Sequence, residues 1–105
     1  MGPRRNVAFI DANEPRIIAY GAYISVDGTQ LTVVHVHSDS ASLEFHMDLA
    51  GPMFRRFVGL VDMSSIQVYG NPSERVLRQL RGKARLLGSG VVRVQPLHAG
   101  LVRSA

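Results

Sequence analysis

The sequence predicts an α+β domain, and three observations support this class. Residues 16–38 hold two runs rich in Ile, Val, Tyr and Thr on either side of Asp27-Gly28, a pair typical of a short hairpin loop. Later segments repeat apolar residues every three or four positions, as amphipathic helices do. The length of 105 residues, with 46% hydrophobic residues, fits a single folded domain over residues 1–105.

The hairpin is the element that the rest of the chain must cover. A two-residue loop at Asp27-Gly28 would place Val26 opposite Thr29, and the register would follow along both strands. Tyr20 would then face His35, and Ile18 would face His37. Both faces of this hairpin are largely apolar, so we expect cover on both sides, from helices of the chain and from a second copy.

The remaining elements follow from local signals. Residues 7–10 fit either a short strand or the last turn of a helix. Asp39 is a good N-cap for a helix that begins at Ser40, and Gly51-Pro52 predicts that this segment forms two short helices. Further along we predict a strand over 65–69, a helix capped by Asn71 that starts at Pro72 and runs to about Leu87, a strand over 91–95 and a tail over 97–105.

Charge and composition narrow the function classes. There are no cysteines, which excludes disulfides and thiolate metal sites and fits a cytoplasmic location. No apolar run reaches the ~20 residues that a membrane-spanning helix needs. The net charge is +4, but five of the twelve basic residues fall in one predicted helix and aromatic residues are few. We therefore predict neither a membrane nor a nucleic-acid partner.

Residues 12–70 resemble the second half of an antibiotic biosynthesis monooxygenase-type domain. The order of strand, DG turn, strand, capped helix and short strand carries the resemblance. The matching residues are Ala12-Asn13-Glu14-Pro15, Ala19-Tyr20, Asp27-Gly28, the run from His35 to His46, Gly51-Pro52 with Phe54 and Phe57, and Ile66 to Gly70.

The resemblance implies a ferredoxin-like fold, with an antiparallel sheet, helices on one face and two subunits packed sheet to sheet as a dimeric α/β barrel. It also implies a pocket between the sheet and its helices. Some members oxidise aromatic substrates or quinols with oxygen and need no metal or flavin. The chain departs from the family in one respect, because only fifteen residues precede the hairpin where the family has about forty. We therefore expect the usual first strand and most of the first helix to be missing, or to be replaced by residues 7–10, and residues 71–96 to add a helix and a strand.

Four residues are the candidates for chemistry. His35 and His37 lie two apart on one predicted strand, so both rings point to the same face, and Tyr20 faces His35 in the predicted register. His46 follows on the next helix. A neutral histidine near pH 7 can take a phenolic proton, so we predict catalytic roles for His35, His37, His46 and Tyr20. Asn13 and Glu14 are explained by the loop before the hairpin.

The predicted function is a cofactor-independent, monooxygenase-like protein that binds or oxidises a small aromatic or quinone-like molecule, as a homodimer or higher homo-oligomer. An aromatic pocket would be lined by Phe45, Met47, Phe54 and Phe57, residues that at helical spacing also suit a core. One alternative is a non-catalytic oligomerisation or regulatory module that uses the arginine-rich helix. Another is a metal enzyme in which the three histidines bind zinc, iron or copper.

Overall fold

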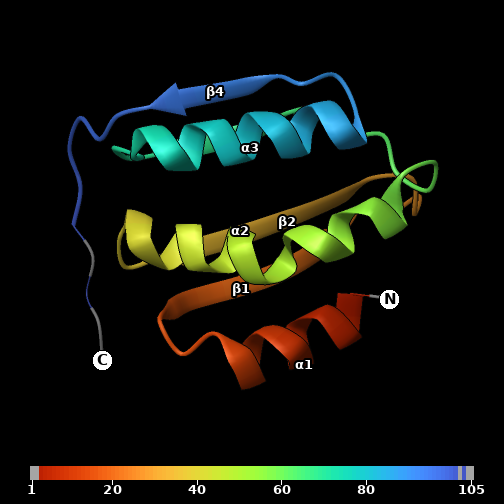
Figure 1. Ribbon diagram of the computed structural model, residues 1–105, viewed down its shortest axis with the longest axis horizontal. Helices are drawn as coiled ribbons and strands as arrows, with labels where there is room; N and C mark the ends of the chain where they lie inside the picture. Colours follow the sequence, from red (N-terminus) through yellow and green to blue (C-terminus); the bar gives the residue numbers. More distant parts are fainter. Residues whose placement is uncertain (1–2, 102, 104–105) are drawn as a thin grey trace. The chain divides into compact units, whose positions relative to one another are not determined.

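The chain forms two compact units, Met1–His46 and Met47–Ala105, in a computed structural model that describes residues 3–101 and 103. The first unit holds α1 (Pro3–Asn13), β1 (Ile17–Ile24), β2 (Leu31–His37) and the start of α2 (Ser40–Phe54). The second holds the rest of α2, a 3-10 helix η1 (Arg55–Phe57), β3 (Ile66–Tyr69), α3 (Glu74–Leu87) and β4 (Val92–Gln95). Helices and small sheets occur together (Figure 1), so the α+β class is confirmed.

Residues 7–10, for which the sequence left strand and helix open, belong to helix α1. Pro3 is its first residue, where a proline costs no intrahelical hydrogen bond. At the other end, Asn13 Nδ2 donates to the Phe9 carbonyl (2.8 Å). Ile10 is buried, so the helix contributes to the core of the first unit.

The hairpin of β1 and β2 has the predicted register from Ala19 to Ile24, with Tyr20 opposite His35. Its loop is longer than predicted, because Ser25 N donates to the Gln30 carbonyl and Gly28 N donates to the Ser25 carbonyl. Four residues, 26–29, therefore form the loop. A four-residue loop centred on the same pair preserves the same register, which explains why the pairing was right although the loop type was wrong.

One end of the hairpin departs from the prediction. A bulge between Ile17 and Ala19 shifts the register, so His37 pairs with Ile17 and the predicted pairing with Ile18 is wrong. A bulge inserts one extra residue in one strand and locally increases its twist. The shift lies at the end of the hairpin that carries His37.

Helix α2 begins at Ser40 as predicted, and Asp39 caps it by accepting a hydrogen bond from Ser42 N (2.8 Å). The predicted break at Gly51-Pro52 is wrong, since the helix continues through Pro52 to Phe54. Pro52 stands in the last turn, where its missing N–H costs a single intrahelical bond. The chain then tightens into η1.

In the second unit, β3 and β4 pair in parallel and α3 connects them, which makes a β-α-β unit. The predicted start of α3 is two residues early: Ser73 is the N-cap, and its hydroxyl accepts from Val76 N (3.1 Å). Glu74 is then the first helical residue, where a negative charge favours the helix dipole. The buried residues of this unit are Met47, Ala50, Val76, Leu80, Ala84 and Leu87.

The segment that precedes β3 is held to the end of α3. Met63 N donates to the Leu87 carbonyl (2.8 Å), and Ser89 N donates back to the Met63 carbonyl (3.1 Å). Gly88 lies between these two bonds, and a Cβ at this position would overlap the backbone of Met63. A glycine is therefore needed here for close approach of two backbone segments.

Candidate functional site

The four residues predicted for chemistry lie together in the first unit. The Tyr20 and His35 rings have their centroids 4.6 Å apart, and His35 and His46 are 4.7 Å apart with their ring planes nearly perpendicular. His37 lies 5.7 Å from His35 and 5.8 Å from His46. The hairpin register and the first turns of α2 thus bring β1, β2 and α2 residues into one histidine cluster, defined as Tyr20, His35, His37 and His46.

Glu14 joins this cluster, and the sequence analysis missed it. His46 Nδ1 donates to Glu14 Oε2 at 2.7 Å, and both side chains are buried, with 3% and 2% of their surface exposed. Glu14 precedes β1 and was explained as a loop residue. Because 32 positions separate the two residues, no local spacing pattern connects them.

The second carboxylate oxygen of Glu14 has no hydrogen-bond partner among the described residues. Glu14 Oε1 is buried, so it is shielded from bulk water as well. A buried acceptor that lacks a donor costs about 1–3 kcal/mol, more when it is charged. Such an atom is an acceptor for a donor from outside the chain, either an ordered water molecule or a bound ligand.

His37 forms a separate contact on the same face. Its Nδ1 shares a hydrogen bond of 2.8 Å with the hydroxyl of Ser42, a buried residue in the first turn of α2. Partial burial and the nearby His46 lower the pKa of His37 to about 4, although Asp39 opposes this change. His37 is therefore a neutral imidazole at pH 7.

Tyr20 is also held in its neutral form. Burial, with a smaller contribution from the negative charge of Glu14, raises the pKa of its hydroxyl above the usual value of 10. Tyr20 is therefore suited to donate or accept a hydrogen bond and to offer a ring surface. It is poorly suited to act as a phenolate base near neutral pH.

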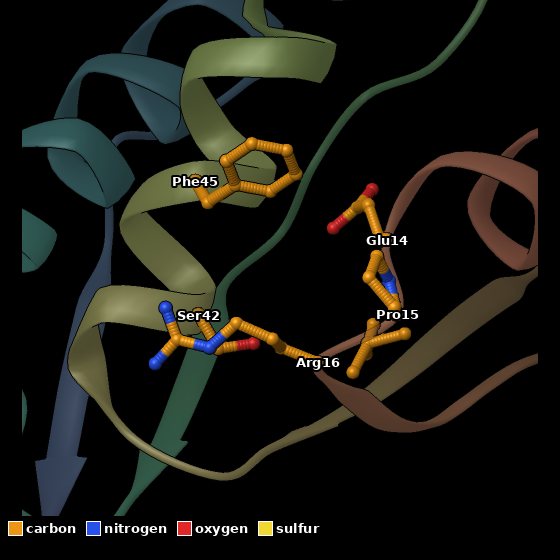
Figure 2. A pocket seen from close by; sticks show the side chains of 6 residues that line it. Glu14, Pro15, Arg16, Ser42 and Phe45 are labelled. Carbon is orange, nitrogen blue, oxygen red and sulfur yellow. The ribbon is translucent and has the colours of Figure 1, made fainter.

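A small cleft opens beside the cluster (Figure 2). It is lined by Glu14, Pro15, Arg16, Ile17, Ser42 and Phe45 and has a volume of about 190 Å³. Glu14 and Ser42 belong both to the cleft and to the hydrogen bonds with His46 and His37. The cleft walls and the histidine cluster are thus joined through two side chains.

The mouth of the cleft carries an ion pair. Arg16 Nη2 donates to both carboxylate oxygens of Asp39, at 2.9 and 2.8 Å, and each side chain is about half exposed. Asp39 also caps α2 through Ser42 N. One carboxylate therefore orients both the arginine and the helix turn that carries Ser42.

The four residues predicted to line an aromatic pocket do not all lie in this cleft. Phe45 lines it, on the turn of α2 next to His46. Met47, Phe54 and Phe57 belong to the second unit and are not among the lining residues. Met47 is buried there, and the Lys83 amine lies 4.3 Å from the centroid of the Phe54 ring. Helical spacing puts Phe45 and Met47 on different sides of α2, but it does not tell which side lines a cleft and which side is packed.

The basic helix α3 is less uniformly exposed than its sequence suggests. Arg75 forms an ion pair with Asp48 at 2.9 Å. The amine of Lys83 lies over the Phe54 ring, and desolvation by burial lowers the pKa of Lys83 to about 8. Arg78, Arg81 and Arg85 are exposed. These three residues are the arginine face of α3.

Two further findings bear on the site. Among residues 3–101 and 103, no group of three His, Asp or Glu side chains is arranged to hold a metal ion, and no helix is long and apolar enough to cross a membrane.

Comparisons with protein-family models, curated proteins and solved structures find no match to this chain. The resemblance to the monooxygenase-type domain stays a prediction, and the site must be interpreted from its own geometry.

Proposed function

We propose that this chain binds a small, single-ring phenol or quinol in the cleft, with its hydroxyl hydrogen-bonded to Glu14. The observation that carries the proposal is the buried Glu14–His46 pair, whose free oxygen, Oε1, belongs to a residue that lines a mostly apolar cleft. His46 Nδ1 fixes the other oxygen, so the carboxylate is already oriented before a ligand arrives.

Cleft volume supports a small ligand. Drug-sized molecules occupy pockets of roughly 300–1,000 Å³, whereas a cavity of about 150 Å³ holds benzene. The cleft, at about 190 Å³, suits one aromatic ring, with Phe45 and Pro15 as its apolar walls. The polycyclic substrates of the monooxygenase-type domains would need more room than this.

We propose that the bound phenol is oxidised by O₂ without a metal or flavin, as the resemblance to that family implies. The hydroxyl proton passes toward Glu14, and the electron-rich ring reduces O₂. A phenol with an unsubstituted para carbon becomes a quinone: one oxygen atom enters the ring and the other leaves as water. The ring supplies all four electrons, so no further reductant is needed. His37 is a neutral imidazole and its ring lies 5.7 Å from that of His35, and a role of both histidines in this proton transfer is part of the proposal.

The test compares phenol with toluene, its isostere without the hydroxyl, by calorimetric titration. Wild type should bind phenol at least about tenfold more tightly than toluene, as expected for a hydrogen bond to a charged acceptor. Glu14→Gln should remove this difference, since its side chain still bonds His46 but loses the charge. Phe45→Ala, the matched control, should weaken both ligands equally.

Two outcomes would contradict the proposal: equal affinity of wild type for phenol and toluene, or no binding of either. Oxygen uptake with phenol, whose para carbon is unsubstituted, then separates binding from turnover after treatment of the protein with a chelator. Normal uptake rates in both His35→Ala and His37→Ala would remove the two histidines from the chemistry.

A second candidate, oligomerisation, is favoured by the outer face of the hairpin. Tyr23, Val34 and Val36 share one face in the observed register and are 63%, 44% and 41% exposed. We propose that this face packs against a second copy, as in a ferredoxin-like dimeric barrel. The arginine face of α3 is an alternative contact for an acidic partner.

A further inference from the structure

Arg16 has unused hydrogen-bonding capacity at the mouth of the cleft. Both of its bonds to Asp39 come from Nη2. Among the described residues, no hydrogen bond from its Nη1 or Nε is found. A guanidinium carries five N–H donors in a planar fork, so three of them stay available to an anion.

Glu14 and Arg16 give the cleft two different ends. Glu14 is 2% exposed at its side chain, whereas Arg16 is 52% exposed. In Figure 2, Glu14 faces the Phe45 ring, while Arg16 extends toward Ser42. The cleft lining therefore combines a buried carboxylate with a half-exposed cation. A ligand in the cleft reaches Glu14 Oε1 only when a neighbouring side chain moves, because this atom is buried.

The lining between these ends is apolar. Pro15, Ile17 and Phe45 present hydrocarbon and ring surface, and the volume of about 190 Å³ allows one aromatic ring. A molecule that satisfies every feature carries a ring in the middle, a hydroxyl donor at the buried end and an anionic group at the exposed end. An anion at the exposed end keeps part of its hydration, so its desolvation cost is small.

We propose that the cleft binds a single-ring aromatic acid with a hydroxyl group, a hydroxybenzoate, whose hydroxyl donates to Glu14 Oε1 and whose carboxylate accepts from Arg16 Nη1 and Nε. The proposal rests on the binding part of the proposed function and adds the carboxylate to it. 4-Hydroxybenzoate, whose para carbon is substituted, is used as a binding probe and not as a substrate of the para oxidation. Asp39 stays paired to Nη2 in the complex, so the arginine holds a protein carboxylate and a ligand carboxylate at once. Plain phenols then bind the same cleft without using its cationic end.

The experiment titrates 4-hydroxybenzoate, phenol and benzoate into the full chain by calorimetry at pH 7. Wild type should bind 4-hydroxybenzoate about tenfold more tightly than phenol, the gain typical of a charge-assisted hydrogen bond. Arg16→Gln should lower the affinity for 4-hydroxybenzoate to that for phenol and leave phenol binding unchanged. Benzoate should bind more weakly than 4-hydroxybenzoate, since it gives Glu14 no donor.

Asp39→Asn is the matched control, because it breaks the same ion pair while its side-chain oxygen can still cap α2. This variant should bind 4-hydroxybenzoate at least as tightly as wild type, since a competing negative charge has been removed. If it loses affinity as Arg16→Gln does, the effect is structural and the contact between Arg16 and the ligand is excluded.

The outcomes also separate this inference from the proposed function. Equal affinities for phenol and 4-hydroxybenzoate in wild type would overturn the carboxylate contact and leave phenol binding in place. If neither molecule binds, both proposals fail.

Discussion

At the scale of single residues, the site depends on a few side chains whose charge states are set by their neighbours. Glu14 is held by His46 and leaves one oxygen free, while His37 is bonded through Nδ1 to Ser42. Most cluster members come from α2 and the two strands, which are hydrogen-bonded elements that fix the side chains. The histidine cluster is therefore largely pre-formed, whereas Glu14 Oε1 is buried and can be reached by a ligand only when a neighbouring side chain moves.

The low pKa of His37 makes a prediction about acid stability. Its pKa is about 4 in the folded chain and about 6.5 when unfolded, so the unfolded chain binds more protons between these values. The contribution of His37 to stability is therefore complete above pH 6.5 and declines as the pH falls toward 4. Chemical denaturation of wild type should show that the free energy of unfolding falls between pH 6.5 and pH 4. His37→Gln should show a smaller fall over the same range.

The titration itself can be followed by NMR of the His37 ring. Desolvation beside His46 predicts a midpoint near pH 4, with Asp39 as the opposing charge and His35 as the other imidazole facing the ring. A midpoint near 6.5 would contradict the burial of this histidine in the cluster.

The histidine cluster was predictable from sequence for a simple reason. A strand alternates its faces, so residues 35 and 37 had to share one, and the turn at Asp27-Gly28 fixed Tyr20 opposite His35. Glu14 was not predictable, because its partner lies 32 positions away and tertiary packing alone brings them together. The ion pair between Arg16 and Asp39 was not predictable for the same reason, because 23 positions separate the two residues.

At the scale of elements, two glycines of the α3 region have opposite roles. Gly82 lies inside α3 with open space around it, whereas Gly88 lies where two backbone segments meet. Gly82→Ala should stabilise the chain by about 0.5–1 kcal/mol, because alanine loses less entropy in a helix. Gly88→Ala should destabilise it by at least about 1–3 kcal/mol, since its Cβ forces the Met63 backbone to move.

Urea denaturation of both variants measures these changes, with the wild type as reference. The close approach of Met63 and Gly88 would be contradicted if Gly88→Ala were as stable as wild type. Loss of stability in Gly82→Ala would contradict the helical assignment at that position.

Elements were easiest to predict where a local signal and the packing agree. The hairpin register from Ala19 to Ile24, the strands β3 and β4, and the end of α3 at Leu87 follow the sequence pattern, whereas the hairpin loop and the bulge at Ile17 do not. Two errors came from local rules that tertiary context changed: Pro52 is tolerated in the last turn of α2, and Ser73 replaces Asn71 as cap because both residue types cap well. The parallel pairing of β3 with β4 has no local signature, since it depends on α3 returning the chain.

At the scale of the whole molecule, the outer face of the hairpin predicts self-association. Light scattering coupled to size exclusion should give the mass of a dimer for the 11.5 kDa chain. Val34→Lys, which places a charge among the exposed apolar side chains of that face, should shift it to monomer. A monomeric wild type, or a dimer unaffected by this change, would contradict packing through this face.

The central claim is that a ring hydroxyl meets Glu14 in the cleft, and a crystal structure of the chain with 4-hydroxybenzoate tests it most directly. The account predicts the ring against Phe45 and the hydroxyl within about 2.6–3.2 Å of Glu14 Oε1, a normal hydrogen-bond distance. A ligand bound elsewhere, or one whose hydroxyl points away from Glu14, would contradict it.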